Sequence, residues 1–307
     1  MTDDVLTVTM NPAVDHTVTV DEPLRTGAVA RTDDAKFDAG GKGINVSKYL
    51  TALGVDAPGT GFLGGPFGRM IRERLDADGV PNDFVTIGDR TRLNTTVLGP
   101  EGEYKINHNG PTVDEQEVSD LIDRVRERDP ERLVVAGSLP KGVTTDAVDE
   151  LAAAGGWETA VDMGGASLTE LDAAYLVCKP NREELAVATD MPVETTADCA
   201  AAAQALRERG FRFVVASLGP DGALLAAESG TYHAAAIPVD VVDTVGAGDA
   251  LLSGFLAGLA RGEDEQTALK TGVTVASRVV GASGTSVPDF DAVFDEREDV
   301  TVSAVRS

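Results

Sequence analysis

The chain has 307 residues, of which 42% are hydrophobic and only 5% aromatic, so it can form one large α/β domain with a core mostly of Val, Leu and Ala. Its 51 acidic residues against 26 basic ones give a net charge of −25, which argues against nucleic acid and anionic membrane surfaces as partners. The two cysteines, Cys178 and Cys199, offer neither a disulfide framework nor a metal-binding spacing.

A cytoplasmic protein is expected, because the first 20 residues contain acidic residues and no long apolar run. No apolar stretch approaches the roughly 18 residues that a membrane span needs. The acidic residues are scattered among periodic apolar segments, as on solvated faces. A charge of this size repels itself unless salt screens it, so adaptation to a cytoplasm of high salt is a hypothesis.

The first part of the chain predicts one buried strand and a small flap. An apolar run over residues 5–10 predicts the strand, which Asn11-Pro12 ends just before Asp15. The following segments alternate apolar and polar residues but carry too few apolar ones for central strands, which favours an exposed flap. The expected flap strands lie at residues 18–20, 29–37, 85–87, 94–98 and 104–106. A helix is expected from about residue 69 to 77.

A glycine turn, Gly40-Gly41-Lys42-Gly43, precedes apolar residues with helical spacing over 46–53, and Gly54 follows where a C-cap glycine belongs. The spacing fits neither a phosphate-binding Walker A loop nor the dinucleotide GxGxxG motif. A tight entry from a strand into a helix would explain one glycine. Three glycines and a lysine in four residues favour a turn whose backbone approaches a ligand closely.

From residue 114 onward, strands alternate with helices, which predicts a parallel sheet covered on both faces. Ligands bind such sheets at the carboxyl ends of the strands, where Ser138, Asn181, Ser217 and Gly219 follow four of the expected strands. The strands are expected at 133–136, 159–163, 176–178 and 213–217, and the helices at 118–125, 143–154 and 197–209.

The segment Asp243-Thr244-Val245-Gly246-Ala247-Gly248-Asp249 reads as a loop that opens an apolar helix. Uncovered N–H groups and the positive end of the helix dipole would form an anion site there. The same dipole is expected to keep the Asp249 carboxylate ionised, so that it can take a proton from a hydroxyl attacking a phosphoryl group. On these residues alone, a glycine-rich helix entry with Asp249 as the N-cap fits equally well.

With these two glycine motifs the chain resembles the ribokinase-like sugar kinases, also called the PfkB family. The resemblance covers nearly the whole chain. Its further segments are Asn11-Pro12-Ala13-Val14-Asp15, Thr91-Arg92-Leu93-Asn94, Gly137-Ser138-Leu139-Pro140, Lys179-Pro180-Asn181-Arg182-Glu183-Glu184 and Ser217-Leu218-Gly219-Pro220-Asp221-Gly222-Ala223.

The resemblance implies an α/β fold, the ribokinase-like three-layer sandwich with a central, mostly parallel sheet and a small β-strand lid. It implies one kinase domain over residues 1–307, with lid strands within about 13–38 and 84–110. It also implies ATP and Mg²⁺ as cofactors, a small sugar phosphate as the other substrate, and a homodimer in which the lids pair.

The family's functional residues carry over onto matching positions. The resemblance implies Asp249 as the catalytic base and the backbone N–H groups of Gly246, Ala247 and Gly248 as the anion hole. The residues implied to hold the sugar hydroxyls are Asp15, Gly40, Gly41 and Asn45. Those implied at the sugar's phosphate are Arg92, with Lys42 and Lys105 as helpers and Ser138 nearby. Those implied along ATP are Lys179, Ser217, Gly219, Gly222 and Thr244, with residues 272–277 at the adenine. Asn181 and Glu184 are implied to position Mg²⁺ through water.

Within the family, Lys42 and Arg92 resemble the branch that phosphorylates sugar phosphates. This implies ATP-dependent conversion of fructose 1-phosphate to fructose 1,6-bisphosphate, with tagatose 6-phosphate and fructose 6-phosphate open as acceptors. A neutral-sugar or nucleoside kinase has no use for both basic residues. A catalytically silent sugar-phosphate sensor is opposed by the intact Asp249, glycine cradle and Asn181/Glu184 pair. A dehydrogenase is opposed by the absence of GxGxxG spacing.

Overall fold

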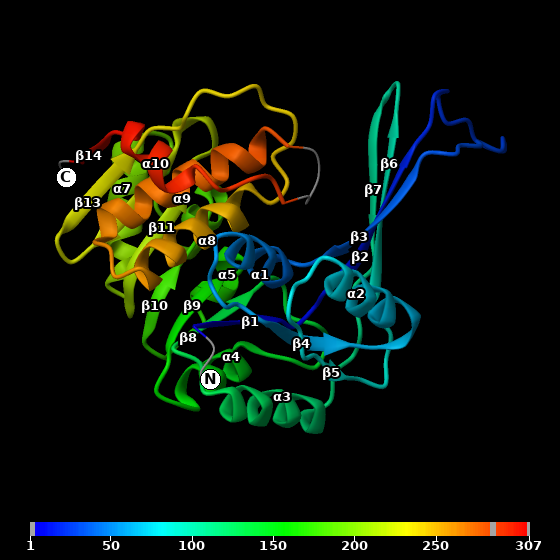
Figure 1. Ribbon diagram of the computed structural model, residues 1–307, viewed down its shortest axis with the longest axis horizontal. Helices are drawn as coiled ribbons and strands as arrows, with labels where there is room; N and C mark the ends of the chain where they lie inside the picture. Colours follow the sequence, from blue (N-terminus) through cyan, green and yellow to red (C-terminus); the bar gives the residue numbers. More distant parts are fainter. Residues whose placement is uncertain (1–3, 283–286, 306–307) are drawn as a thin grey trace.

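The computed structural model describes residues 4–282 and 287–305. Its larger sheet contains β1 (Val5–Thr9), β4 (Gly59–Leu63), β5 (Val85–Thr86), β8 (Arg132–Ala136), β9 (Glu158–Asp162), β10 (Tyr175–Cys178), β11 (Phe211–Ser217), β12 (Ala223–Ala227), β13 (Gly230–Ala234) and β14 (Val302–Ala304). Across the sheet, the described strands follow the order β14-β13-β12-β11-β10-β9-β8-β1-β4-β5 (Figure 1). The strands from β11 to β5 pair in parallel, and β12, β13 and β14 continue the sheet antiparallel.

Helices cover both faces of this sheet (Figure 1). The helices are α1 (Lys42–Ala52), α2 (Gly65–Ala77), α3 (Glu115–Arg128), α4 (Thr145–Ala153), α5 (Gly165–Leu168), α6 (Arg182–Thr189), α7 (Thr196–Arg207), α8 (Ala247–Ala260), α9 (Glu265–Val280) and α10 (Val293–Glu296). Side chains of α3 to α7 pack into one core cluster, and those of α1, α8, α9 and α10 pack into another. The three-layer sandwich and the mostly parallel sheet confirm the expected fold class.

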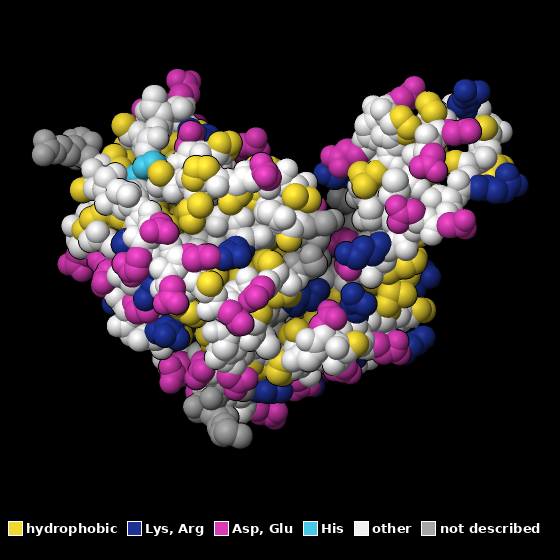
Figure 2. Space-filling model, turned by 45° about the horizontal axis from the view of Figure 1, so that its top comes forward, with side chains coloured by type: hydrophobic (Ala, Val, Ile, Leu, Met, Phe, Trp, Pro, Cys, Tyr) yellow, Lys and Arg dark blue, Asp and Glu magenta, His cyan; other side chains and the backbone are white. Residues whose placement is uncertain are grey.

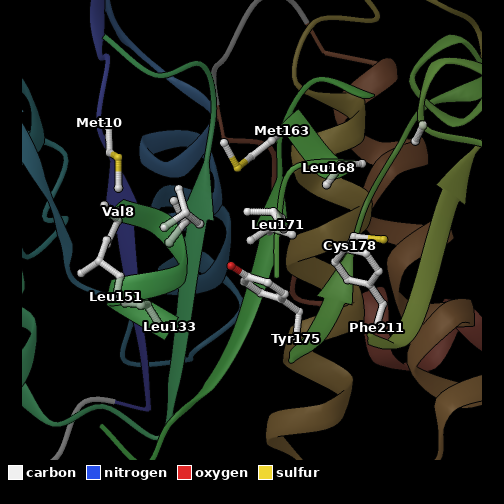
Figure 3. Close-up of a cluster of buried hydrophobic side chains, with 14 of the residues drawn as sticks. Val8, Met10, Leu133, Leu151, Met163, Leu168, Leu171, Tyr175, Cys178 and Phe211 are labelled. Atoms are coloured by element: carbon white, nitrogen blue, oxygen red, sulfur yellow. The ribbon is translucent and has the colours of Figure 1, made fainter. Parts of the chain in front are cut away.

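The strands are apolar on both sides because both faces of the sheet are buried. Along β8, Leu133 and Val135 belong to one cluster, whereas Val134 and Ala136 belong to the other. Figure 3 shows part of the first cluster, where Leu133 lies near Val8 and Leu151, and Tyr175 lies near Phe211. Burying one such large apolar side chain contributes about 1.5–3 kcal/mol.

A second sheet of four described strands projects from the body (Figure 1). It contains β2 (Ala13–Thr19), β3 (Ala35–Gly40), β6 (Arg92–Gly99) and β7 (Gly102–Asn107), in the order β3-β2-β6-β7. We call this sheet the lid. Its base is anchored by Val14 and Ala39, which are buried in a third cluster with α2, while Leu93 packs against that cluster.

Several expected strand bounds were wrong. The pair expected at 18–20 and 29–37 lies at Ala13–Thr19 and Ala35–Gly40, so β3 runs directly into the glycine turn. The strand expected in the flap at 85–87 is β5, which pairs with β4 in the large sheet. The reason is burial, because Val85 and Ile87 pack into the core of the body and leave no exposed face for a flap strand.

Other elements were missed or misplaced. Strand β4 has few β-formers, and Gly61, with a φ of 133°, brings it so close to β1 that an added Cβ would lie 2.0 Å from the Thr9 carbonyl oxygen. Strands β12 and β13 were not anticipated either. Helix α2 begins at Gly65, four residues before the expected start near 69, because Gly65 and Pro66 form its first turn.

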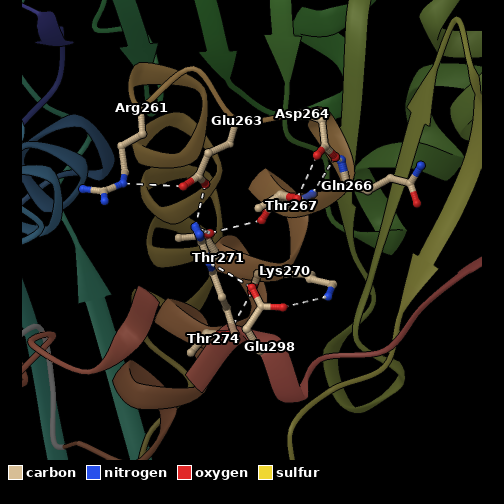
Figure 4. A network of polar contacts seen from close by, with 10 residues as sticks. Arg261, Glu263, Asp264, Gln266, Thr267, Lys270, Thr271, Thr274 and Glu298 are labelled. Atoms are coloured by element: carbon tan, nitrogen blue, oxygen red, sulfur yellow. Dashed lines mark hydrogen bonds and ion pairs between the residues drawn. The ribbon is translucent and has the colours of Figure 1, made fainter. Parts of the chain in front are cut away.

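Acidic side chains are scattered over the face of the body and lid that Figure 2 shows, with basic side chains interspersed among them. Cys178 and Cys199 are both free and buried. Among the residues that the structure describes, no helix is long and apolar enough to cross a bilayer. Figure 4 shows how α9 is fixed at its start, where the N-cap Asp264 accepts hydrogen bonds from the backbone N–H groups of Gln266 and Thr267.

Candidate active site

The two glycine motifs meet at the carboxyl edge of the parallel sheet. Gly246 is the N-cap of α8 and Gly41 is the N-cap of α1, so two helix N-termini begin at this edge. The Asn45 side chain on α1 donates a hydrogen bond of 2.7 Å to Asp249 Oδ2 on α8, although 204 residues separate them. The fold therefore joins the two motifs in one site, as the rule for parallel sheets predicts.

Two glycines at the start of α8 leave little room for a side chain. Gly246 has a φ of 79°, and a Cβ there would lie 2.6 Å from the Tyr49 hydroxyl oxygen. A Cβ on Gly248 would lie 3.0 Å from Lys179 Nζ. The first N–H groups of a helix have no acceptors within it, so Gly248 and Asp249 present donors beside this ammonium group, whereas the Ala247 N–H donates to the Thr244 carbonyl oxygen at 3.3 Å. This arrangement suits an anion.

Asp249 is the third residue of α8 rather than its N-cap, and only 6% of it is exposed. Burial raises the pKa of its carboxyl group, the nearby Asp162 raises it further, and Asn45, Lys179 and Lys42 oppose the rise. The raised pKa runs against the expectation that the helix dipole keeps Asp249 ionised, because desolvation favours the neutral carboxyl group. A buried carboxyl group with a raised pKa is suited to accept a proton near neutral pH.

Asp162, the last residue of β9, is a site residue that the sequence reasoning missed. It is fully buried, and its Oδ1 lies 2.7 Å from Lys42 Nζ. Its Oδ2 makes no hydrogen bond but lies 3.3 Å from Lys179 Nζ. An ionisable residue at the carboxyl end of an otherwise apolar strand was the available signal.

The base of the lid carries a second polar group on the other side of the glycine turn. Asp15 on β2 accepts a 2.9 Å hydrogen bond from Asn94 on β6, and its carboxylate lies over Gly40, where a Cβ would be 1.9 Å from Asp15 Oδ2. Burial raises the pKa of Asp15, whereas Asn94 and Arg92 lower it. The sequence alone indicated no role for Asn94 beyond its place in the Thr91–Asn94 motif. Its contact with Asp15 follows from the pairing of β2 with β6, which sets the two residues opposite each other.

Arg92, the first residue of β6, is held by the end of β1. Its Nε and Nη2 donate to the Asn11 carbonyl oxygen at 3.2 and 3.0 Å, and Asn11 Nδ2 donates to Ser138 Oγ at 3.1 Å. The Asn11 side-chain oxygen is buried without a hydrogen-bond partner. Asn11 thus links Arg92 to Ser138, and together with Asp15 they form a half-buried basic and polar surface.

A cavity of about 880 Å³ lies on the opposite side, against α6, α8 and α9. Its lining includes four positions expected along ATP, namely Ser217, Gly219, Gly222 and Thr244. It also includes Asn181, expected at Mg²⁺, Ala247 and Gly248 of the expected anion hole, and Val273, Ala276 and Ser277 from the segment expected at the adenine. Most of the remaining lining is apolar. A mainly apolar cavity that ends at a helix N-terminus fits a nucleotide, with its base in the cavity and its phosphates at the anion site.

The match to known families agrees with this geometry. The pfkB family carbohydrate kinase model matches residues 8–291. The chain belongs to this family. It is 57% identical to the 1-phosphofructokinase of Haloferax volcanii over 99% of both chains, and 34% identical to that of Escherichia coli K12 over 93% of both.

Among solved structures, this kinase is similar to phosphofructokinase-2 from Escherichia coli in complex with fructose-6-phosphate. The two share 28% identity, with a TM-score of 0.83 over 91% of this chain and 94% of the other. Family membership makes the chain a phosphotransferase that acts on a carbohydrate.

The Asn-x-x-Glu motif of the kinase forms a reciprocal cap at the start of α6. Asn181 Oδ1 accepts from the Glu184 backbone N–H and Glu184 Oε2 accepts from the Asn181 N–H, both at 2.8 Å. The second oxygen, Glu184 Oε1, lies 3.7 Å from Lys42 Nζ. Carboxylate oxygens suit Mg²⁺, which usually keeps several waters, so the Glu184 carboxylate fits a magnesium ion held partly through water. Among the described residues, no group of three or more His, Cys, Asp and Glu side chains forms a metal cage.

Lys105 is not brought together with the other site residues. It lies on the exposed strand β7 and pairs with Glu103 on the same strand at 2.9 Å. Its register partner is Thr96, so it shares a face of the lid with Asn94 and Arg92 but lies further towards the tip. Lys179 and Glu184 lie beside the cavity rather than in its lining.

Proposed function

We propose that the kinase transfers the γ-phosphoryl group of ATP to fructose 1-phosphate, giving fructose 1,6-bisphosphate and ADP. The observation that carries this proposal is the position of Asp249, which is buried at the start of α8 between the Asp15/Arg92 surface and the nucleotide cavity. The two relatives named above, which match over nearly their whole length, are 1-phosphofructokinases.

The proposed reaction uses the two sides of the site separately. Asp15 and Asn45 hold sugar hydroxyl groups, and Gly40 and Gly41 let the sugar approach the backbone. Arg92, with Ser138 nearby, binds the phosphate that the sugar already carries, since a guanidinium matches phosphate oxygens in pairs. This orientation leaves the hydroxyl at the far end of the sugar, on C6, pointing towards Asp249.

The transfer step is an in-line displacement. As the C6 hydroxyl oxygen forms its bond to the γ-phosphorus, its proton passes to Asp249, and the bond from that phosphorus to the bridging oxygen breaks, so that ADP leaves with the electron pair. The N–H groups of Gly246, Ala247 and Gly248 and the ammonium group of Lys179 stabilise the negative charge of the moving group. Asn181 and Glu184 would hold Mg²⁺ through water, and the ion would supply positive charge that neutralises the nucleotide phosphates.

The lid completes the proposal. Closure of the lid over the sugar would exclude water, which otherwise competes as the phosphoryl acceptor. Its exposed apolar side chains, among them Phe37, Tyr104 and Ile106, favour a homodimer in which two lids cover one another. We also propose that the enzyme works in the cytoplasm and, because of its net charge of −25, at high salt.

Fructose 6-phosphate and tagatose 6-phosphate are the alternative acceptors, and the first is present in the structure of the Escherichia coli phosphofructokinase-2. A coupled assay of ADP release in molar salt with Mg²⁺ and ATP tests the proposal by comparing kcat/KM for the three hexose phosphates, fructose and ribose. The highest value is expected for fructose 1-phosphate. A preference for a 6-phosphate would change the assigned substrate but leave the proposed mechanism in place. Turnover of unphosphorylated sugars alone would overturn the role of Arg92.

A further inference from the structure

The basic residues of the site fall into two separate electrostatic groups. Burial lowers the pKa of Arg92, and Asp15 is the charge that opposes this. Burial also works against the charge of Lys42, but there Asp162, Glu184 and Asp249 prevail and raise the pKa. Arg92 therefore belongs with the sugar-binding carboxylate, whereas Lys42 belongs with the catalytic carboxylate and the cap of α6.

The contacts of Lys42 agree with this division. Lys42 is the first residue of α1, and its Nζ lies 2.7 Å from Asp162 Oδ1 and 3.7 Å from Glu184 Oε1. The other oxygen of Asp162 lies 3.3 Å from Lys179 Nζ, which in turn lies against Gly248 at the anion site. Asp162 thus holds two ammonium groups on neighbouring sides of one carboxylate, and 36% of the Lys42 side chain remains exposed to a ligand.

The balance of positive and negative charge at the site suggests a role for Lys42. Three carboxylates act on Lys42: its Nζ lies 2.7 Å from Asp162 Oδ1 and 3.7 Å from Glu184 Oε1, and Asp249 is the third charge that raises its pKa. Without Lys42, only Lys179 and the proposed Mg²⁺ would oppose these carboxylates, and the surroundings would be less favourable to the phosphoryl group as its negative charge spreads over its oxygens. An ammonium group acts on phosphate as a compact point charge and does not need the fixed paired geometry of a guanidinium.

We propose that Lys42 binds the phosphoryl group during its transfer, and not the phosphate that the sugar already carries. Asp162 acts as a positioning residue that holds Lys42 and Lys179 on either side of the transfer path. The division of labour rests on the proposed function, since it assigns the sugar's own phosphate to Arg92. No proton moves to or from Lys42 in this step.

Two binding measurements separate the roles, using Lys42→Met and Arg92→Met. The first is titration calorimetry with fructose 1-phosphate in the absence of nucleotide. Arg92→Met is expected to weaken this binding by about 10- to 100-fold, as for loss of a charged hydrogen-bonding group, while Lys42→Met leaves it within about threefold of wild type.

The second measurement is the affinity for ADP with aluminium fluoride and Mg²⁺, without sugar, in which the fluoride complex stands in for the moving phosphoryl group. Lys42→Met is expected to weaken this complex by about 10- to 100-fold while leaving affinity for ADP alone unchanged. Lys42→Arg, which keeps the charge, is expected to restore part of the affinity and also serves if the Met variant folds poorly.

Lys270→Met is the matched control, because it removes an ammonium group on α9 that pairs with Glu298 at 3.8 Å (Figure 4). It is expected to leave both affinities unchanged. Weaker sugar binding in Lys42→Met, equal to that in Arg92→Met, would overturn the inference, as would an unchanged affinity for the aluminium fluoride complex in both Lys42 variants. If wild type failed to bind fructose 1-phosphate, the proposed function would fall, yet the aluminium fluoride experiment would still decide the role of Lys42.

Discussion

Replacing Gly40 with alanine tests how the glycine turn serves the sugar. An added Cβ would lie 1.9 Å from Asp15 Oδ2 and 2.6 Å from its Cγ, so the carboxylate must move by about 1 Å to reach even a very short contact. The backbone of Gly40 is not left-handed, so alanine adds no backbone strain there. The substitution should therefore displace the Asp15 carboxylate without lowering the stability of the fold.

The expected size follows from this displacement. A misplacement of about 1 Å can cost on the order of 10²-fold, which equals about 3 kcal/mol. In the ADP-release assay, we expect Gly40→Ala to raise KM for fructose 1-phosphate by roughly this factor and to leave KM for ATP within about threefold.

Gly156→Ala is the matched control, because a Cβ there meets no atom within 4 Å. Both variants should melt within a few degrees of wild type, since neither creates a cavity or buries a polar group. Normal sugar affinity in Gly40→Ala would show that Asp15 does not hold the sugar, and an equal loss of affinity for ATP and sugar would refute the reasoning from a local displacement.

Four further predictions concern the base and the surface charge. Asp249→Asn is expected to keep ATP binding and lower kcat by on the order of 10²–10⁴-fold, and near-normal turnover would remove the assignment of the base. Because the pKa of Asp249 is raised in the folded state, the fold loses stability as pH rises from the unfolded-state pKa to the folded-state pKa. Above this range, Asp249→Asn should melt no lower than wild type. A clearly lower melting temperature would contradict this. The kcat/KM of wild type should fall on acidification at a pH above that of an ordinary carboxylate, about 3.9, because the base must be ionised, and a flat profile down to pH 4 would oppose this. Lowering the salt from about 1 M to 0.1 M lengthens the Debye length from about 3 to 10 Å, so the melting temperature should fall, whereas a constant melting temperature would oppose the salt hypothesis.

The sequence by itself determined the fold class and the two glycine turns at which the ligands were expected to bind. Alternation of apolar strands with helices predicts a parallel sheet, and such a sheet places its ligands at the carboxyl ends of strands. Gly40, Gly41, Gly246 and Gly248 were recognisable because two glycine turns before helices seldom occur by chance in the same chain order as the rest of a family's motifs. These predictions depend on local patterns and on residue type.

Only the tertiary structure decided which residues share a charge environment. Asp162 looked like the end of an ordinary strand, and its two lysines come from α1 and from the loop after β10, 120 and 17 residues away. The pKa of a carboxyl group depends on how far its neighbours exclude water. The position of Asp249 near a helix N-terminus in the sequence does not reveal the burial that raises its pKa. For the same reason, the assignment of Val85 to the flap was wrong. The assignment relied on alternation along the chain, whereas the burial of Val85 depends on packing against distant segments. Periodicity is a property of neighbours in the sequence, whereas burial and charge are properties of neighbours in space.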